Sequence, residues 1–311
     1  MSFRTDVPAF YFEWWHNRLQ AGFFDVRNPY YPTKVSRQSL APEHFDGIYY
    51  ISKNFAPMLD PRYNLPELVR TFPSVFNFTI NPYGSFMEPN VPLLKRRLET
   101  LQQLSDIVGP ARLMWGYNPL LITERFNLNW HLEALPLMFE EIAPYVSRFS
   151  FDVVSLYDKV KRNAPDVRPP SASEYQAIVT LIGELCAEHH LTVRLCPQKG
   201  DLTALGIEQA VCMPVSWLAQ ANGLTPKPRV RPQTLESCMI CGSVAHRDVG
   251  TYDTCPHLCR YCYANASPSR VRKTQRAYDP RSTMLCDAPR PGDEISSPKV
   301  TTYFERGTTL I

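Results

Sequence analysis

The sequence lacks several features that would assign it to common classes of protein. It has no uninterrupted apolar stretch of about 18 residues, which argues against a membrane-spanning helix. Its 33 basic and 30 acidic side chains leave a net charge of only +3, too small to indicate nucleic acid or an anionic membrane as a partner. The opening Met1-Ser-Phe-Arg-Thr-Asp6 lacks the apolar core of a signal peptide. We therefore expect a cytoplasmic protein.

Cysteine is missing from the first half of the chain and is concentrated toward its end. No cysteine precedes Cys186, although the chain has nine. Six of them lie close together: Cys238, Cys241, Cys255, Cys259, Cys262 and Cys286. In a reducing compartment such a group is more typical of a metal site than of disulfide bonds.

The first 232 residues are expected to alternate between strands and helices. Strands are predicted at 47–51, 75–80, 112–115, 149–154, 191–195 and 209–212, and helices at 8–21, 91–107, 129–146 and 172–190. Residues 23–31 and 34–40 are expected to form a small hairpin. The alternation favours an α/β protein with a parallel sheet, and its length suggests a (β/α) TIM-like barrel, complete or incomplete.

Two shorter regions are expected to follow the barrel-like domain of residues 1–232. A proline-rich linker ends at Pro232, and residues 233–265 carry the cysteine-rich segment. Residues 266–311 are rich in proline and arginine and show no helical or strand period, so we expect an irregular tail that wraps over the surface.

The cysteine segment contains Cys255-Pro-His-Leu-Cys259-Arg-Tyr-Cys262. This spacing can direct three thiolates at one small cage, and three ligands leave one iron of a 4Fe–4S cluster without a protein donor. An electron-transfer cluster is normally closed by a fourth cysteine. An open iron suggests that a small molecule binds there.

Cys255, Cys259, Tyr261 and Cys262 resemble the signature of the radical SAM superfamily, in which S-adenosylmethionine (SAM) chelates the open iron. The chain also resembles an uncharacterised bacterial family, a domain of unknown function with such a motif near its C-terminus. This likeness covers residues 1 to about 265. It is carried chiefly by Arg4-Thr-Asp-Val-Pro-Ala-Phe-Tyr11, Val26-Arg-Asn-Pro-Tyr30 and Asp248-Val-Gly-Thr-Tyr-Asp-Thr-Cys-Pro-His257.

Two departures from the superfamily pattern are visible in the sequence. The cysteines usually follow the first barrel strand, whereas here they follow the last predicted strand. Because the last strand of a barrel lies beside the first, a C-terminal segment can fold over the same mouth. The chain also has no Gly-Gly-Glu segment of the kind that binds the methionine amino group of SAM.

The resemblance implies an enzyme that cleaves SAM reductively with one electron from an external reductant such as flavodoxin or ferredoxin. Most of the superfamily generates a 5′-deoxyadenosyl radical, which acts on a small-molecule substrate. Some members instead transfer a 3-amino-3-carboxypropyl group. The surplus of thiols suits a soft acceptor such as arsenite, and the sequence invites comparison with the radical SAM enzymes of arsinothricin biosynthesis.

Two other interpretations of the cysteines remain open. A zinc site would use four tetrahedral ligands, and Cys238 with Cys241 offers one pair while Cys259 with Cys262 offers another. A closed iron–sulfur cluster would make the protein an electron carrier. In either case the barrel would be stabilised by metal without catalysing a reaction.

Further residues complete the predicted site. Cys238 and Cys241 are candidates for a second metal or cluster, and Cys196 and Cys212, near predicted strand ends, are candidates for catalytic residues that receive a thiophilic substrate. Strand ends converge at the mouth of a barrel, where chemistry normally takes place. The candidates for cofactor binding there are Arg4, Asp6, Lys53, Tyr83, Tyr117 and Tyr261. His257 is expected to lie beside the cluster ligands.

Overall fold

The structure is a computed structural model, and it describes residues 2–193, 213–239, 244 and 246–305. The strands are β1 Phe23–Arg27, β2 Lys34–Ser39, β3 Ile48–Ser52, β4 Ser74–Thr79, β5 Leu113–Leu120, β6 Arg148–Val153, β7 Thr192–Val193 and β8 Glu294–Ser296. The α-helices are α1 Val7–Phe10, α2 Phe12–Ala21, α3 Leu65–Thr71, α4 Gly84–Met87, α5 Leu94–Val108, α6 Leu128–Ile142, α7 Asp158–Asn163, α8 Ala172–Glu188, α9 Val215–Asn222, α10 Pro232–Leu235 and α11 Pro268–Gln275. Short 3₁₀ helices are η1 Pro42–His44, η2 Ala56–Leu59, η3 Pro61–Tyr63, η4 Pro110–Arg112 and η5 Ala143–Tyr145.

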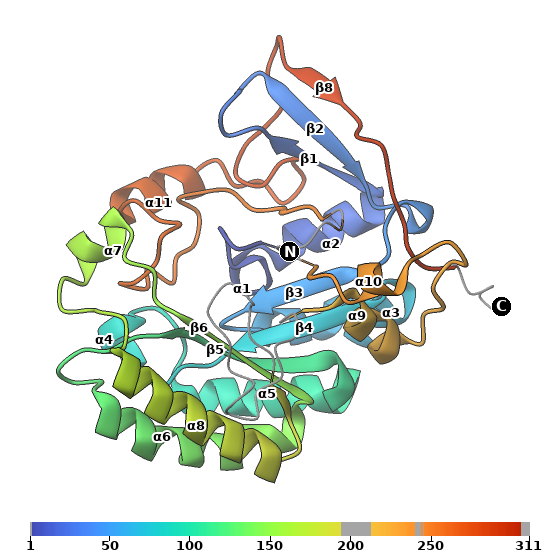
Figure 1. Cartoon of the computed structure of the whole chain (residues 1–311). Helices are drawn as coiled ribbons and strands as arrows, with labels where there is room; N and C mark the ends of the chain where they lie inside the picture. The colour runs from blue at the N-terminus through green and yellow to red at the C-terminus, as the bar shows by residue number, and fades with distance from the viewer. Residues whose placement is uncertain (1, 194–212, 240–243, 245, 306–311) are drawn as a thin grey trace.

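Five parallel strands form the main sheet in the order β3-β4-β5-β6-β7 (Figure 1). Neighbours in the sheet are also neighbours in the sequence, and helices α3, α5, α6 and α8 connect them in turn. The predicted α/β class is therefore confirmed. A capping box precedes α8, since Ser171 and Glu174 each accept from the other's backbone N–H.

The described strands give an open sheet, and closure into a barrel stays a prediction. The strand predicted at 191–195 is described only as Thr192–Val193, and the one predicted at 209–212 lies outside the described residues. The sequential strand order with connecting helices is the arrangement found in one part of a (β/α) barrel.

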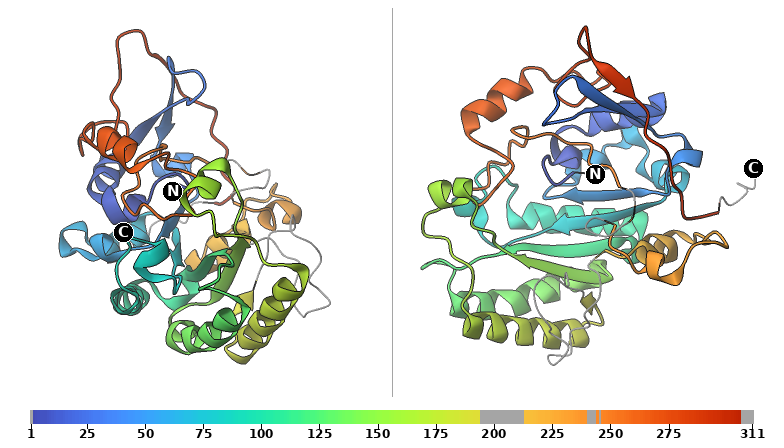
Figure 2. Two further views of the ribbon diagram at one scale, coloured as in Figure 1. Left: turned by 90° about the vertical axis from the view of Figure 1, so that its left-hand side faces the viewer. Right: turned by 45° about the horizontal axis from the view of Figure 1, so that its top comes forward.

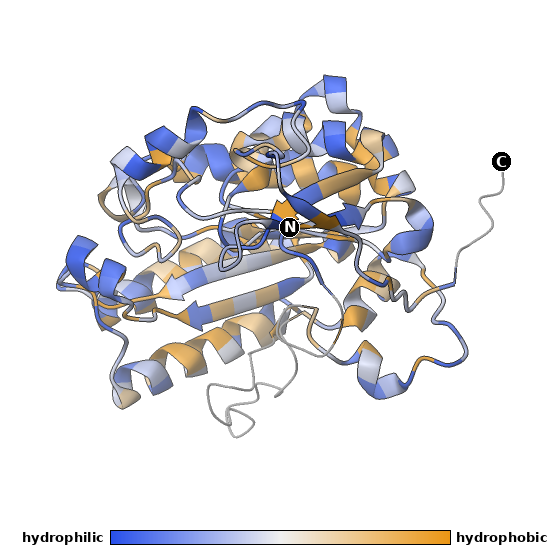
Figure 3. Cartoon of the chain, turned by 90° about the horizontal axis from the view of Figure 1, so that it is seen from above, coloured by the Kyte–Doolittle hydropathy of each residue, from blue (hydrophilic) through white to orange (hydrophobic). Residues whose placement is uncertain are grey.

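Apolar side chains on one face of the sheet make the largest core. Phe76, Trp115 and Phe149 pack there against the inward faces of α5, α6 and α8. These helices lie together below the sheet in Figure 1, and Figure 2 shows the same layer from two other directions. In Figure 3 the helices carry both hydrophobic and hydrophilic residues, as expected for elements with only one face on the core.

The opposite face of the central strands carries polar and small residues near the carboxyl ends. Asn77 and Thr79 of β4 and Ser150 of β6 are buried polar residues. Gly116 of β5 lies between the side chains of Asn77 and Asn118. A Cβ at Gly116 would lie 2.5 Å from Asn77 Oδ1 and 3.0 Å from Asn118 Nδ2, so a larger residue would require these two amide groups to move.

A second, three-stranded sheet has the order β1-β2-β8 and lies apart from the main sheet at the top of Figure 1. β1 and β2 form the predicted hairpin, with Phe23 opposite Ser39. The expectation of a tail without regular structure was wrong. Residues 268–275 form α11, and β8 pairs in parallel with β2. α11 begins at Ser267, whose side chain caps Arg270 N, and Pro268 occupies its first turn.

The tail is held on the N-terminal part of the chain by buried and half-buried contacts. Trp14 Nε1 donates to the carbonyl oxygen of Ser282 at 2.9 Å. Arg27 is 2.6 Å from both Asp287 Oδ2 and Asp293 Oδ1.

Within the part of the chain that the structure describes, no helix is long and apolar enough to cross a membrane.

Candidate functional site

Polar residues at the ends of neighbouring strands converge as the sequence predicts. Lys53 follows β3, Asn81 follows β4, and Asn118 lies near the end of β5. The carbonyl oxygen of Asn118 accepts from Asn81 Nδ2 at 2.7 Å and lies 3.4 Å from Lys53 Nζ. The carboxyl edge of the sheet thus carries a compact polar group.

A buried carboxylate that the sequence did not reveal stands at the centre of this group. Glu88, which is 1% exposed, accepts at Oε1 from Lys53 Nζ at 2.8 Å and from Asn81 Nδ2 at 2.9 Å. The Tyr261 hydroxyl donates to the same oxygen. Arg97 NH1 lies 3.7 Å from Oε2, and this arginine is also buried. Glu88 is therefore shared by two cations.

The charge of Glu88 is stabilised by these cations. Burial by itself raises the pKa of the carboxyl group, whereas Lys53 and Arg97 lower it, and the pKa ends below its usual value of 4.5. Arg97 is held in position by its hydrogen bonds to two backbone carbonyls, that of Pro92 at 3.0 Å and that of Asn81 at 2.9 Å.

The loop that carries the three cysteines docks on this carboxyl edge. The Tyr261 hydroxyl binds Glu88, and the backbone N–H of Arg260 donates to the carbonyl of Met87 at 2.9 Å. Asn90 Nδ2 donates to the carbonyl of Pro256 at 2.8 Å. Cys259 and Tyr261 share an apolar cluster with residues that follow β4, β5 and β6, namely Tyr83, Met87, Leu121, Phe126 and Val154. The loop thus covers the mouth that several strand ends form.

Asp6 connects the N-terminal segment to β3 and to the cysteine loop. Its Oδ2 accepts from the backbone N–H of Lys53 at 2.8 Å and from His257 Nε2 at 2.9 Å. Its Oδ1 accepts from Ser52 Oγ at 2.7 Å and from Ala9 N at 3.1 Å, where it caps α1. Asp6, Lys53 and His257 therefore occupy one site.

The three cysteines lie close enough to influence one another. Burial, followed by the Asp6 charge and then Cys262, raises the pKa of the Cys255 thiol. Burial also raises the pKa of Cys259, while the nearby Lys53 ammonium opposes the rise and the Glu88 charge adds to it. Cys255 thus lies near the Asp6 carboxylate, and Cys259 lies near both Lys53 and Glu88.

The chemistry of these donors fits an iron–sulfur cluster. Three soft sulfurs lie within one loop, and each can bind a different iron. Among the residues that the structure describes, no three His, Cys, Asp or Glu side chains are arranged to hold a single metal ion. Cys255, Cys259 and Cys262 are therefore the residues that would hold the cluster.

Buried polar atoms without a hydrogen-bond partner among the described residues surround the same edge. They are Glu88 Oε2, Arg97 NH1, and the side-chain oxygens of Asn77, Asn81 and Asn118. A buried polar atom without a partner is costly, and such atoms are often satisfied by a ligand or water. They make this edge of the sheet a candidate for binding a polar group.

A comparison with protein-family models matches residues 1–264 to one family, the domain of unknown function DUF1848. The chain belongs to the DUF1848 family. The expected likeness to such a family is confirmed, and the match ends just after the cysteine loop. Comparisons with curated proteins and with solved structures give no match.

The remaining predicted cofactor residues of the DUF1848 domain are placed differently. Arg4 contacts Asp248 Oδ2 at 3.1 Å and does not reach the Glu88 group. Tyr83 is buried, its ring centroid is 6.4 Å from that of Tyr261, and its hydroxyl donates to the carbonyl of Pro119 at 2.8 Å. Tyr83 therefore lines the site from below the loop.

Tyr117 lies in the core behind Tyr83 and not at the mouth of the DUF1848 domain. Its hydroxyl donates to His131 Nδ1 at 2.7 Å, because His131 Nε2 donates to the carbonyl of Leu121 at 2.8 Å. Burial lowers the pKa of His131 to about 4, which keeps this ring neutral. Tyr117 thus supports the site from within the core.

Of the other cysteines predicted at the site, the structure describes only Cys238, which lies apart from the loop. Cys238 is buried in a separate apolar cluster with Trp217 and Phe304. Trp217 Nε1 donates to the carbonyl of Ala111, so this cluster lies at the amino end of β5. Cys241, the predicted partner of Cys238, lies outside the described residues. The same is true of the candidates for catalysis, Cys196 and Cys212.

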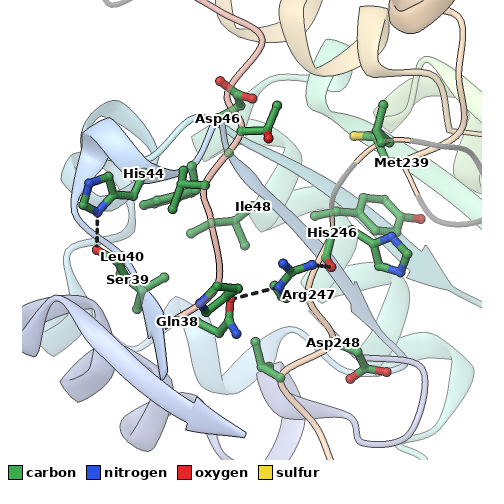
Figure 4. Close-up of a pocket in the computed structure, with 18 of the residues that line it drawn as sticks. Gln38, Ser39, Leu40, His44, Asp46, Ile48, Met239, His246, Arg247 and Asp248 are labelled. Atoms are coloured by element: carbon green, nitrogen blue, oxygen red, sulfur yellow. Dashed lines mark hydrogen bonds between the residues drawn. The ribbon is translucent and has the colours of Figure 1, made fainter. Parts of the chain in front are cut away.

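A cavity of about 530 Å³ opens elsewhere in the DUF1848 domain. It lies between the hairpin, the start of β3 and residues 297–304, and Figure 4 shows Arg247 Nε donating to Gln38 Oε1 across it at 2.9 Å. None of the predicted cofactor residues lines this cavity. We place the candidate site at the cysteine loop, where the chemically reactive groups gather.

Proposed function

We propose that the chain is a radical SAM enzyme that holds a 4Fe–4S cluster through Cys255, Cys259 and Cys262. When bound, the cluster would deliver one electron to the sulfonium of SAM, so that one carbon–sulfur bond breaks. The electron would come from an external reductant such as flavodoxin or ferredoxin. The products would be methionine with a 5′-deoxyadenosyl radical, or methylthioadenosine with an aminocarboxypropyl radical. Transfer of the latter to a soft acceptor such as arsenite would release water and take up one proton and a second electron from the reductant.

The observation that carries this proposal is the position of the cysteine loop. It lies on the carboxyl ends of β3, β4 and β5, where the hydrogen bonds of His257 to Asp6 and of Tyr261 to Glu88 hold it. Ligands of open parallel sheets and barrels bind at this edge. A three-thiol loop placed there can present the fourth iron to a small molecule at the mouth.

We also propose that the main sheet belongs to a (β/α) barrel, and the contacts of the N-terminal segment support this. Thr5 Oγ1 donates to the carbonyl of Thr251 at 2.8 Å, and the Tyr263 hydroxyl donates to the carbonyl of Phe3 at 2.8 Å. The chain preceding β3 thus runs beside the chain that leads into the cysteine loop. In a closed barrel the first and last units are neighbours in the same way.

This chain's own residues would orient the cofactor and limit the access of water. A ligand with N–H or O–H groups would find three acceptors here. They are the amide oxygens of Asn81 and Asn118 and Oε2 of Glu88, none of which accepts a hydrogen bond from the described residues. Tyr83 and Tyr261 provide apolar ring surface beside these acceptors.

The test is to reconstitute the protein with iron and sulfide under anaerobic conditions, reduce it and add SAM. Analysis of iron and acid-labile sulfide should give one cluster per chain, and 5′-deoxyadenosine or methylthioadenosine should form. Cys259→Ala should lose both the iron and the products. The matched control is Cys186→Ala, because Cys186 is a buried residue of α8 away from the loop and its loss should leave iron content unchanged.

A metal clasp without catalysis is the second candidate, and one observation favours it. The loop segment binds the N-terminal residues through several hydrogen bonds, so a metal there would also join two distant parts of the chain. A protein that retains one zinc and gives neither SAM product would establish the clasp. A reducible cluster whose spectrum ignores SAM would establish an electron carrier.

A further inference from the structure

Lys53, Glu88 and Arg97 form a buried ionic group with two cations and one anion. The side chains are 15%, 1% and 2% exposed, respectively. Lys53 and Glu88 are joined at 2.8 Å, whereas Arg97 NH1 and Glu88 Oε2 stay 3.7 Å apart without a hydrogen bond. A buried positive charge in excess of its partner is unfavourable unless another anion lies nearby.

The cation that Glu88 binds lies beside the cysteine loop. Lys53 Nζ lies 5.5 Å from the centroid of the Tyr261 ring, and Tyr261 stands between Cys259 and Cys262 in the sequence. The Tyr261 hydroxyl donates to the same Glu88 oxygen that accepts from Lys53 Nζ. The ammonium is therefore held beside the loop that carries the proposed ligands.

A second carboxylate contacts both Lys53 and the loop. Asp6 Oδ2 accepts from His257 Nε2 at 2.9 Å, and His257 stands between Cys255 and Cys259 in the sequence. Lys53 separates the two acidic groups, because its backbone N–H donates to Asp6 and its ammonium donates to Glu88. Lys53 thus links the two carboxylates that hold the loop.

We propose that Lys53 is a positioning residue that sets the reduction potential of the cluster, with Glu88 holding its ammonium beside Tyr261 of the cysteine loop. The inference rests on the proposed function. Reduction adds one negative charge to the cluster, and a fixed cation nearby stabilises the reduced state. In this low-dielectric setting the loss of the ammonium lowers the potential, and the loss of the Glu88 charge raises it.

The experiment is a redox titration of the reconstituted protein without SAM, followed by electron paramagnetic resonance. It compares the wild-type chain with Lys53→Met, Lys53→Arg, Glu88→Gln and Arg37→Met. Arg37→Met is the matched control, because it also removes a cation from an ion pair, here with Asp25 in the hairpin sheet. Iron and sulfide are measured on each sample first.

We expect Lys53→Met and Glu88→Gln to shift the midpoint potential in opposite directions. The midpoint potential should become more negative in Lys53→Met and more positive in Glu88→Gln, and it should stay at the wild-type value in Lys53→Arg and Arg37→Met. If Lys53→Met does not assemble a cluster, the sign in Glu88→Gln decides. Unchanged potentials, or shifts of the same sign, in samples with a full cluster overturn the inference alone. A wild-type chain without an iron cluster overturns the proposed function and the inference together.

Discussion

His257 and Asp6 are 251 residues apart in the sequence, and His257 Nε2 donates a hydrogen bond to Asp6 Oδ2 at 2.9 Å. His257 lies between two of the proposed cluster ligands, whereas Asp6 caps the first helix. The contact is enclosed, with side-chain exposures of 2% and 8%. The first few residues of the chain therefore help to hold the cysteine loop in place.

We expect Asp6→Asn and His257→Gln to destabilise the fold and to do so cooperatively. Asp6→Asn removes the charged acceptor of four hydrogen bonds and should cost about 2–3 kcal/mol, and the pair should show a coupling energy of about 1 kcal/mol or more. Urea denaturation of both single variants and the double variant measures the coupling. Strictly additive losses would show that the bond does not link the two segments.

Glu88→Gln should lower the free energy of unfolding by about 3 kcal/mol at pH 7, because Lys53 and Arg97 would lose their common buried anion. The folded-state pKa of Glu88 lies below 4.5, so its charge stabilises the fold above that pH. The stabilisation is lost as the pH falls through the lower, folded-state value. The free energies of unfolding of the wild type and of Glu88→Gln should therefore approach each other in acid.

The control for this change is Glu67→Gln, which removes an exposed ion pair with Arg70 on α3 and should cost less than about 1 kcal/mol. Urea denaturation between pH 3 and pH 7 provides the comparison. A stability difference for Glu88→Gln that stays constant over this range would contradict the assignment of the charge.

Gly250→Ala should separate the N-terminal segment from the segment that leads into the cysteine loop. A Cβ at position 250 would lie 2.0 Å from Ser2 Oγ and 2.7 Å from Thr5 Oγ1, so the two segments cannot keep their present distance. We expect a loss of about 1–3 kcal/mol. Thermal unfolding measures it, and Ser2→Gly in the same chain should restore part of the loss by removing the closest atoms. No rescue would mean that Ser2 is not the obstacle.

Arg27→Ala should release the tail from the hairpin sheet. Arg27 contacts two aspartates of the tail, Asp287 and Asp293, as well as the carbonyl of Ala288. Limited trypsin digestion should then cut faster after the exposed Arg281 and Lys299. Arg70→Ala is the control, since its ion pair lies on the surface of α3 and far along the chain from the tail. Equal cleavage rates in both variants would show that Arg27 does not hold the tail.

The main sheet was predictable because its signals are local. Each of β3 to β6 is a short run of β-branched and aromatic residues, and the helices between them carry apolar residues at helical spacing. α11 and β8 have no such signal. Only Val271 of α11 is buried, and all three residues of β8 are exposed. Both elements form because the tail packs on the N-terminal part of the chain, a contact that no local pattern indicates.

The candidate site was predictable only in part, for a similar reason. The cysteine spacing and the polar strand ends are visible in the sequence, whereas Glu88 lies in a short segment after α4 and has no motif around it. Arg97 offered a signal, because it takes an apolar position of α5, one turn before the buried Leu101. A charged residue at such a position calls for a buried partner. The charge balance of the site emerges only when the strands bring these residues together.

Thr5 binds Thr251 across 246 residues of sequence, and this contact sets the earliest time at which the fold can be completed. A ribosome adds about 5–20 residues per second, so the N-terminal segment waits roughly 12–50 s before its partner has been synthesised. During that interval Tyr11 and its neighbours, buried in the finished molecule, are still uncovered. Nascent chains are therefore most exposed to chaperones and proteases at their oldest end.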